Sequence, residues 1–172
     1  MDVQEAILKR QSIRRFKNIP IEKSVIENLL MLAHQAPSAG NTQARDFILI
    51  DDPKIKEQLR PLAHNQRVLT EAPLVIAVCA NLDRIQPYGQ RGKNLYCLQD
   101  TAAAIDHFLL LATEAGFATC WVGAFNEQHV HELLQLPENS RPVALIPIGY
   151  ANEKPKKTDR IELKELLHYN TW

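Results

Sequence analysis

Residues 94–116 read NLYCLQDTAAAIDHFLLLATEAG and predict the longest helix of the chain, from Asn94 to Ala115. Apolar side chains recur in it at helical spacing but extend well beyond a single face. Gly116 is a natural end, because glycine readily adopts the backbone conformation that closes a helix. A helix that is apolar on most sides is buried on most sides, which in a chain of 172 residues indicates a central position or a subunit interface.

Apolar stretches on both sides of this helix predict the strands of a sheet. The clearest is LVIAVCA, residues 74–80, which is rich in β-branched side chains. The others are FILI at 47–50, FATCWVGAF at 117–125 (a strand or an extended turn) and VALIPIGY at 143–150. Strands that alternate with helices indicate a helix-covered sheet, and the pattern leaves the strand order open.

Shorter helices are predicted around these strands. Three of them begin at a residue whose side chain can accept the free N–H groups of a first helical turn. These are Asp2, for a helix through Lys9, Asp51 and Asp52 before Pro53, for a helix that ends near Ala63, and Asn126, for a helix through Leu134. Two more helices span 22–36 and the last residues up to Trp172, whereas the glycines, proline and charges of 82–92 predict a mobile loop.

Size and composition favour one domain, residues 1–172, of a cytoplasmic protein. The 20 basic and 20 acidic residues leave a formal net charge of +0, which argues against a nucleic-acid partner. Three cysteines without CxxC spacing indicate buried, reduced thiols and a reducing compartment. The N-terminus lacks a signal-peptide pattern, and no apolar stretch approaches the roughly 20 residues that span a bilayer.

Several common catalytic and binding motifs are absent from the sequence. It contains no GxGxxG, no GxxxxGK[ST], no GxSxG and no HExxH. His129 and His131 are two apart on a predicted helix and do not share a face, so no metal site is expected. Recognition of a phosphate would therefore depend on side chains.

The stretch KRQSIRRF, residues 9–16, is the first candidate binding motif. In an extended segment Arg10, Ser12 and Arg14 point to the same side, and two guanidinium groups around a hydroxyl can clamp a phosphate. Ile13 and Phe16 would anchor the segment on the core. The alternative is a solvated basic linker.

Three further stretches carry suitable polar or small residues, each with a simpler alternative. PSAGNTQ, residues 37–43, offers amide and hydroxyl groups for a pyrimidine-like edge, or is only a turn that ends a helix. Trp121, Val122 and Gly123 end an apolar strand where a ring could approach the main chain, or they are a core tryptophan and a turn glycine. Lys154, Lys156, Lys157 and Arg160 are a possible anion site or a solvated surface loop.

Taken in order, these stretches resemble the FMN-dependent nitroreductase family, in a short version. The matching elements are RQSIRRF, APSAGNTQ, EAPLVIAVCAN, AGFATCWVGAF and IPIGYANEKP, which keep the family's order over nearly the whole chain. The resemblance implies an α+β fold with a central, mostly antiparallel sheet wrapped by helices. It also implies an intertwined homodimer with two FMN sites, each built from both subunits.

The resemblance assigns the cofactor-binding residues by position. Arg10 and Ser12 would hold the FMN phosphate, Arg14 would reach the ribityl chain or the pyrimidine, and Arg160, with Lys157, would close the phosphate site. Gln66 would contact the pyrimidine edge, and Val122 and Gly123 would offer main-chain groups to the ring. Pro37, Ser38 and Asn41 would line the flavin from the partner subunit. No side chain is expected to act as a nucleophile.

The implied activity is electron transfer from NADH or NADPH, through FMN, to a small oxidised acceptor such as a nitroaromatic or a quinone, by ping-pong exchange. The alternatives are a non-catalytic flavin-binding sensor or carrier and a flavin-remodelling enzyme of the same fold. Two departures affect the pocket. Ala44 and Arg45 stand where many relatives have Pro-Trp, which is expected to change the wall beside the flavin, and residues 83–93 are short, which favours an open pocket.

Overall fold

The computed structural model describes residues 1–155 and 158–172 and contains a four-stranded sheet. Its strands are β1 (Arg45–Ile50), β2 (Leu74–Asn81), β3 (Ala118–Thr119) and β4 (Ser140–Gly149). They lie in the order β1-β2-β4-β3, and every neighbouring pair is antiparallel. The strand order, which the sequence pattern leaves open, thus follows from long-range pairing of β2 with β4.

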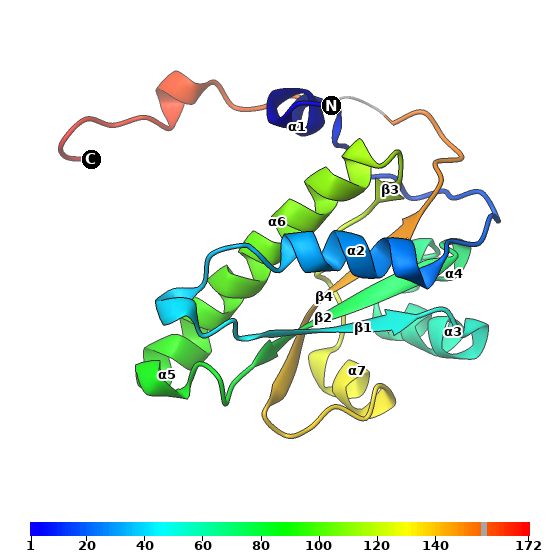
Figure 1. Ribbon diagram of the computed structural model, residues 1–172, viewed down its shortest axis with the longest axis horizontal. Coiled ribbons are helices and arrows are strands. Elements are labelled where there is room, and N and C mark those ends of the chain that lie inside the picture. Colours follow the sequence, from blue (N-terminus) through cyan, green and yellow to red (C-terminus); the bar gives the residue numbers. More distant parts are fainter. Residues whose placement is uncertain (156–157) are drawn as a thin grey trace.

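Helices cover both faces of the sheet (Figure 1). Along β2, Leu74, Ile76 and Val78 pack with α2 (Lys23–Ala33) and α6 (Cys97–Glu114). The alternate residues Val75 and Ala77 pack on the opposite face with α3 (Pro53–Leu62), α4 (Val68–Glu71) and α7 (Glu127–Leu133). Strand side chains alternate between faces, so an all-apolar strand is buried on both. This is the α+β arrangement that the resemblance implies.

Capping side chains begin three helices as predicted. The Asp2 carboxylate accepts the N–H of Glu5 at the start of α1 (Val3–Lys9), and Asp52 accepts the N–H of Lys54 ahead of α3. The Asn126 side chain accepts the N–H of His129 in α7. Each bond satisfies a donor that the helix itself leaves free, so local sequence fixes these boundaries.

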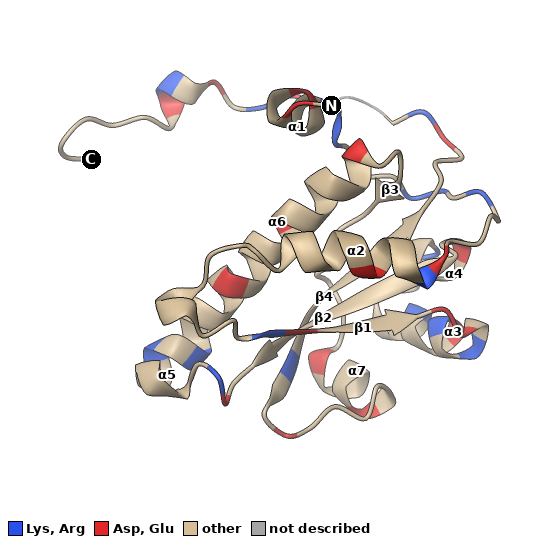
Figure 2. Cartoon of the chain, in the orientation of Figure 1, with Lys and Arg blue, Asp and Glu red and all other residues tan. Residues whose placement is uncertain are grey.

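The long helix α6 takes the central position that its apolar surface predicts, packed against α1, α2 and the sheet. It begins at Cys97, and not at Asn94, because Gly92–Tyr96 form a π-helical turn. Charged residues within the sheet lie near strand ends, as at Arg45 and Asp46, and the inner parts of the strands are apolar (Figure 2). None of the helices described here combines the length and apolar character needed to cross a lipid bilayer.

Two predicted segments differ in the structure. Residues 82–92 are not a featureless loop, because they form the turns η2 (Gln86–Tyr88) and α5 (Gly89–Arg91) over the fully buried side chain of Ile85. The predicted terminal helix is wrong, since only the single turn η4 (Leu163–Glu165) is helical. Every residue from Thr158 to Trp172 is exposed. A helix this short is marginal without a surface on which to bury its apolar side.

Candidate functional site

The segment Arg10–Phe16 is extended and is held along the edge of the sheet. Ile13 donates its N–H to the Thr119 carbonyl at 2.9 Å, and Ser12 forms a parallel bridge with Thr119. Ile13 and Phe16 are 5% and 6% exposed, so the predicted anchoring is confirmed. The segment is therefore an ordered extended stretch and not a solvated linker.

The positive charges of Arg10 and Arg14 both act on the thiol of Cys120. Burial raises the pKa of the Cys120 thiol, and the positive charges of Arg14 and Arg10 oppose that rise while Glu153 adds to it. The extended backbone explains how side chains four positions apart can act on one group. Arg10 and Arg14 thus both act on Cys120, and their binding of a phosphate stays a prediction.

Glu153 joins the first motif of the chain to the last. Its Oε1 atom accepts the main-chain N–H groups of Arg14 at 2.6 Å and Arg15 at 3.2 Å. Nearby, Lys17 donates to the Tyr150 carbonyl and Asn152 donates to the Arg15 carbonyl, both through main-chain N–H groups. The sequence motifs alone do not reveal this contact, because it joins residues 139 and 138 positions apart.

A shallow cavity of about 300 Å³ lies beside this junction. It is lined by Arg14, Arg15, Gln66, Arg67, Val68, Glu71 and Glu153. The Gln66 amide donates to the Ala124 carbonyl at 3.3 Å, which places it beside the strand end at Val122 and Gly123. Arg14 and Gln66, assigned to one site by the resemblance, thus share a cavity.

At the strand end Val122–Gly123, the main chain of Val122 is hydrogen-bonded and Gly123 is accessible to solvent. Val122 exchanges both main-chain hydrogen bonds with Leu145 at 2.9 Å, so its N–H is not available to a ligand. Gly123 is exposed, and a Cβ built on it would meet only the Trp121 ring nitrogen, at 3.9 Å. Trp121 is 41% exposed and is not a core residue. A flat ring could therefore approach the main chain at Gly123.

The second group of predicted residues, Pro37, Ser38 and Asn41, lies in the loop after α2. The Ser38 hydroxyl accepts the N–H of Gln43 at 3.0 Å. The loop contains η1 (Ala39–Asn41), and Gly40, Asn41 and Gln43 have φ angles of 52°, 57° and 50°. A positive φ is unfavourable for residues with a side chain, so contacts around the loop must maintain this shape.

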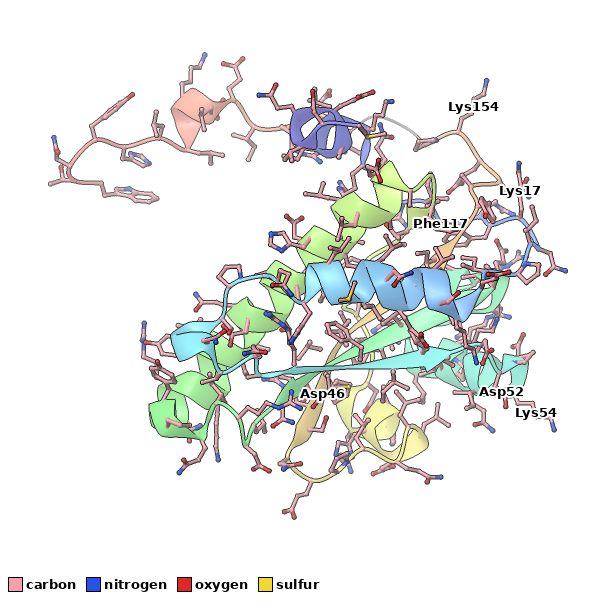
Figure 3. All side chains as sticks on the ribbon, in the orientation of Figure 1. Lys17, Asp46, Asp52, Lys54, Phe117 and Lys154 are labelled. Atoms are coloured by element: carbon pink, nitrogen blue, oxygen red, sulfur yellow. The ribbon has the colours of Figure 1, made fainter. Side chains whose placement is uncertain are left out.

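The two groups lie near opposite ends of α6. The Ala39 N–H donates to Asp100, in the first turn of α6, at 2.9 Å, whereas the Met1 ammonium contacts Glu114, in the last turn, at 3.5 Å. A helix of 18 residues is roughly 27 Å long. Figure 3 likewise shows Lys17 and Lys154 at one edge of the molecule and Asp46, near the loop, well away from them. A single chain does not bring the groups together.

Arg160, the last residue of the basic stretch after β4, does not join the site in this chain. The Arg160 guanidinium donates to Thr158 and to the Asp159 carbonyl, within its own exposed segment. Among the described residues, no hydrogen bond joins it to Arg10 or Ser12. Lys156 and Lys157 lie outside the described residues.

Arg45 lines a cavity of about 650 Å³ together with His34 and Arg84, although Ala44 and Arg45 are themselves almost inaccessible to solvent. Ala44 is 0% exposed and Arg45 is 2% exposed. The Arg45 guanidinium is directed inward and binds main-chain carbonyls at the end of α2. The departure from the family pattern thus affects the interior beneath the loop, where sequence reasoning gave no reason to place a charged residue.

All three thiols are buried, which leads to a prediction for chemical labelling. Burial raises the pKa of Cys79 from its ordinary 9.0 to about 11, and it raises the pKa of Cys97 and Cys120 as well. The native protein at pH 8 is expected to react slowly with Ellman's reagent, and all its cysteines should react after unfolding. Because the folded pKa of Cys79 is the higher one, its contribution to stability is lost as the pH rises from about 9 towards 11. Rapid labelling of any native thiol would contradict the burial.

Comparisons with known proteins cover nearly the whole chain. A sequence model of the nitroreductase family matches residues 7–67 and 61–150. The NADH dehydrogenase of Thermus thermophilus is 26% identical over 195 residues, covering 97% of this chain and 95% of that protein. The iodotyrosine deiodinase of Haliscomenobacter hydrossis is 29% identical over 170 residues, covering 84% and 77%. The structure of NfrA1 nitroreductase from B. subtilis has a TM-score of 0.89 at 26% identity, covering 99% of this chain and 74% of that one.

Proposed function

Because the chain belongs to the nitroreductase family, we propose that it is an FMN-dependent oxidoreductase that takes electrons from NADH or NADPH. Its acceptor would be a small oxidised molecule such as a nitroaromatic or a quinone, reduced after the nicotinamide has left. The observation that carries the proposal is the shared cavity of Arg14 and Gln66, beside the extended Arg10–Phe16 segment.

The residues around this cavity suit the parts of FMN. Arg10, Ser12 and Arg14 alternate on an extended backbone, which fits a phosphate and the polar chain attached to it. The Gln66 amide can donate and accept at a pyrimidine edge. The open space at Gly123 admits a flat ring close to the main chain. Bound FMN would supply the hydride chemistry, for which the protein offers no nucleophile.

The roles of the side chains follow from charge and position. Arg14 would place a positive charge beside the ring system, and a cation there stabilises the negative charge that reduction adds. The main-chain N–H of Gly123 would orient the ring, because the N–H of Val122 already donates to the Leu145 carbonyl. Arg160 and Lys157 would close the phosphate site in the assembled protein.

A homodimer would complete the site. Pro37, Ser38 and Asn41 lie near the end of α6 opposite to the Arg10 segment, so a second copy must supply them if both groups bind one flavin. The terminal segment reaches away from the body of the chain (Figure 1). Several large apolar side chains of this segment, of α1 and of α2 are exposed, and a second copy would cover them. They are Ile161, Leu163, Leu166, Leu167, Tyr169 and Trp172 in the tail, and Val3, Ile7, Leu8, Met31 and Leu32 on the helices.

Deleting residues 161–172 is expected to weaken the dimer at least about 100-fold, because each large apolar side chain contributes roughly 1.5–3 kcal/mol when buried. Light scattering after size-exclusion chromatography, over a dilution series, measures the effect. Lys164→Gln is the matched control, since Lys164 pairs with Glu162 in the same exposed tail and carries no large apolar side chain. A truncated protein that stays as dimeric as the full chain would remove the tail from the interface.

An absorbance spectrum of the purified protein, with and without added FMN, tests the proposal directly. Bound FMN should appear as the yellow flavin bands, and anaerobic NADH or NADPH should bleach them before an acceptor restores them. A protein that stays colourless with excess FMN would refute it. Bound FMN that never bleaches would indicate a flavin sensor or carrier, and loss or conversion of the flavin, seen by mass spectrometry, would indicate a flavin-remodelling enzyme.

A further inference from the structure

We propose that Arg45 and Asp100 form a positioning pair that holds the loop of residues 36–41 in the shape that contacts the flavin. Arg45 binds this loop from the interior of the protein and Asp100 binds it from α6. The inference rests on the proposed FMN site, to which it adds two residues that would not touch the cofactor. It concerns a part of the chain that departs from the common family pattern.

The Arg45 side chain is enclosed and all its nitrogens are engaged. Nη2 donates to the carbonyls of His34 and Ala36, both at 2.7 Å. Nη1 donates to the carbonyls of Asp100 at 3.1 Å and Pro37 at 3.4 Å, and Nε donates to His34 Nδ1 at 3.5 Å. These contacts match the five N–H groups of a guanidinium, which no other side chain can present in one plane.

The place of Arg45 explains why a cation is stable there. The last carbonyls of a helix lack partners within it, and the aligned peptide dipoles make that end negative. Arg45 lies at that end of α2 and binds the carbonyls that follow it. Burial lowers the pKa of Arg45, and the charge of Asp100 opposes that change.

Asp100 restrains the other side of the same loop. It is 4% exposed, and its Oδ1 atom accepts the Ala39 N–H at 2.9 Å. The loop is thus bound at its carbonyls by one buried charge and at an N–H by another. Pro37 and Asn41 remain exposed and Ser38 half-buried, on the accessible side of a backbone with two positive φ angles, at Gly40 and Asn41. Because Arg45 and Asp100 bind the loop from the interior, its outer surface is left accessible to a cofactor bound by a second copy.

Arg45→Met removes every donor and is expected to raise the FMN dissociation constant at least about tenfold, because it leaves buried carbonyls unpaired. Arg45→Lys keeps the charge and should give an intermediate value. Asp100→Asn keeps the Oδ1 acceptor and should resemble the natural protein, whereas Asp100→Leu should resemble Arg45→Met. The visible circular dichroism of bound FMN, which reports the shape of the site, should change in the same order.

Hydrogen exchange of the Ala39 amide in flavin-free protein gives a readout that needs no cofactor. Exchange should be slow in the natural protein and in Asp100→Asn, and fast in Asp100→Leu and Arg45→Met. Lys56→Met is the matched control, because Lys56 is also buried, at 7% exposure, and donates to two main-chain carbonyls, those of Ala72 and Pro73. It should lower stability and leave both readouts unchanged.

The outcomes separate this inference from the proposed function. A natural protein that binds no FMN but shows the predicted exchange pattern would refute the FMN site and retain the loop restraint without its proposed purpose. Normal FMN affinity and slow Ala39 exchange in folded Arg45→Met would overturn the inference. It would also fail if Lys56→Met changed both readouts as much as Arg45→Met does.

Discussion

Replacing Arg10 by alanine is expected to raise the FMN dissociation constant about 10- to 100-fold, because a hydrogen bond to a charged group contributes roughly 1.5–3 kcal/mol. Arg10 is half-buried at the end of α1 and shares its charged neighbourhood with Arg14. Fluorescence titration of FMN into the flavin-free protein measures the change. Added salt should weaken FMN binding to the natural protein more than to the variant, because the variant has lost one of the charges that salt screens.

Lys9→Ala is the matched control for this prediction. Lys9 precedes Arg10 and carries the same charge, but its ammonium pairs with Glu5 at 2.6 Å on the exposed side of α1, and Lys9 is not among the residues that line the cavity beside Arg14. Removing its side chain should change the affinity by less than about threefold, the range of an exposed charge. Equal affinities of the Arg10 and Lys9 variants would contradict a specific role of Arg10 in binding the phosphate.

Combining two defective subunits is expected to restore flavin binding at one of the two sites of a heterodimer. Arg10→Ala damages the phosphate side of a subunit. Gly40→Val damages its loop, because Gly40 has a positive φ and a Cβ there would overlap the Tyr88 hydroxyl. If each site takes its two sides from different copies, one site of the mixed dimer contains only intact parts.

Two affinity tags isolate the heterodimer for this experiment. Each mutant homodimer should bind FMN weakly, and the heterodimer should bind one FMN with the affinity of the natural protein. The double mutant Arg10→Ala/Gly40→Val paired with a natural subunit is the control, since both of its sites would then contain one damaged part. A heterodimer that binds FMN as weakly as the mutant homodimers would show that both sides come from the same copy.

Local chemistry in the sequence predicts much of the fold. Asp2, Asp52 and Asn126 cap their helices as expected, because capping needs only neighbouring residues. Strand β2 is evident because it is apolar on both faces. The terminal segment is predicted incorrectly, since helical spacing near Leu163 does not reveal whether any surface is available to bury those side chains.

The candidate site is less predictable, because it depends on contacts between distant segments. Motif order assigns Arg14 and Gln66 to one site, but it does not indicate that Glu153 binds the Arg14 main chain. Motif order also does not show that the Val122 N–H donates to the Leu145 carbonyl. Arg45 is the clearest case, because a charged residue usually predicts an exposed position. Here its guanidinium binds the His34 carbonyl, which is free to accept because α2 ends at that point in the folded chain.

The separation of the two groups near opposite ends of α6 has a thermodynamic consequence for the proposed dimer. If each flavin bridges two copies, cofactor affinity and subunit affinity are linked, and each must strengthen the other by the same factor. Dilution of the protein would then release FMN, and saturation with FMN would hold the two copies together at concentrations where the flavin-free protein dissociates. Cellular supply of the vitamin-derived cofactor would in this way set how much of the protein exists in its assembled form.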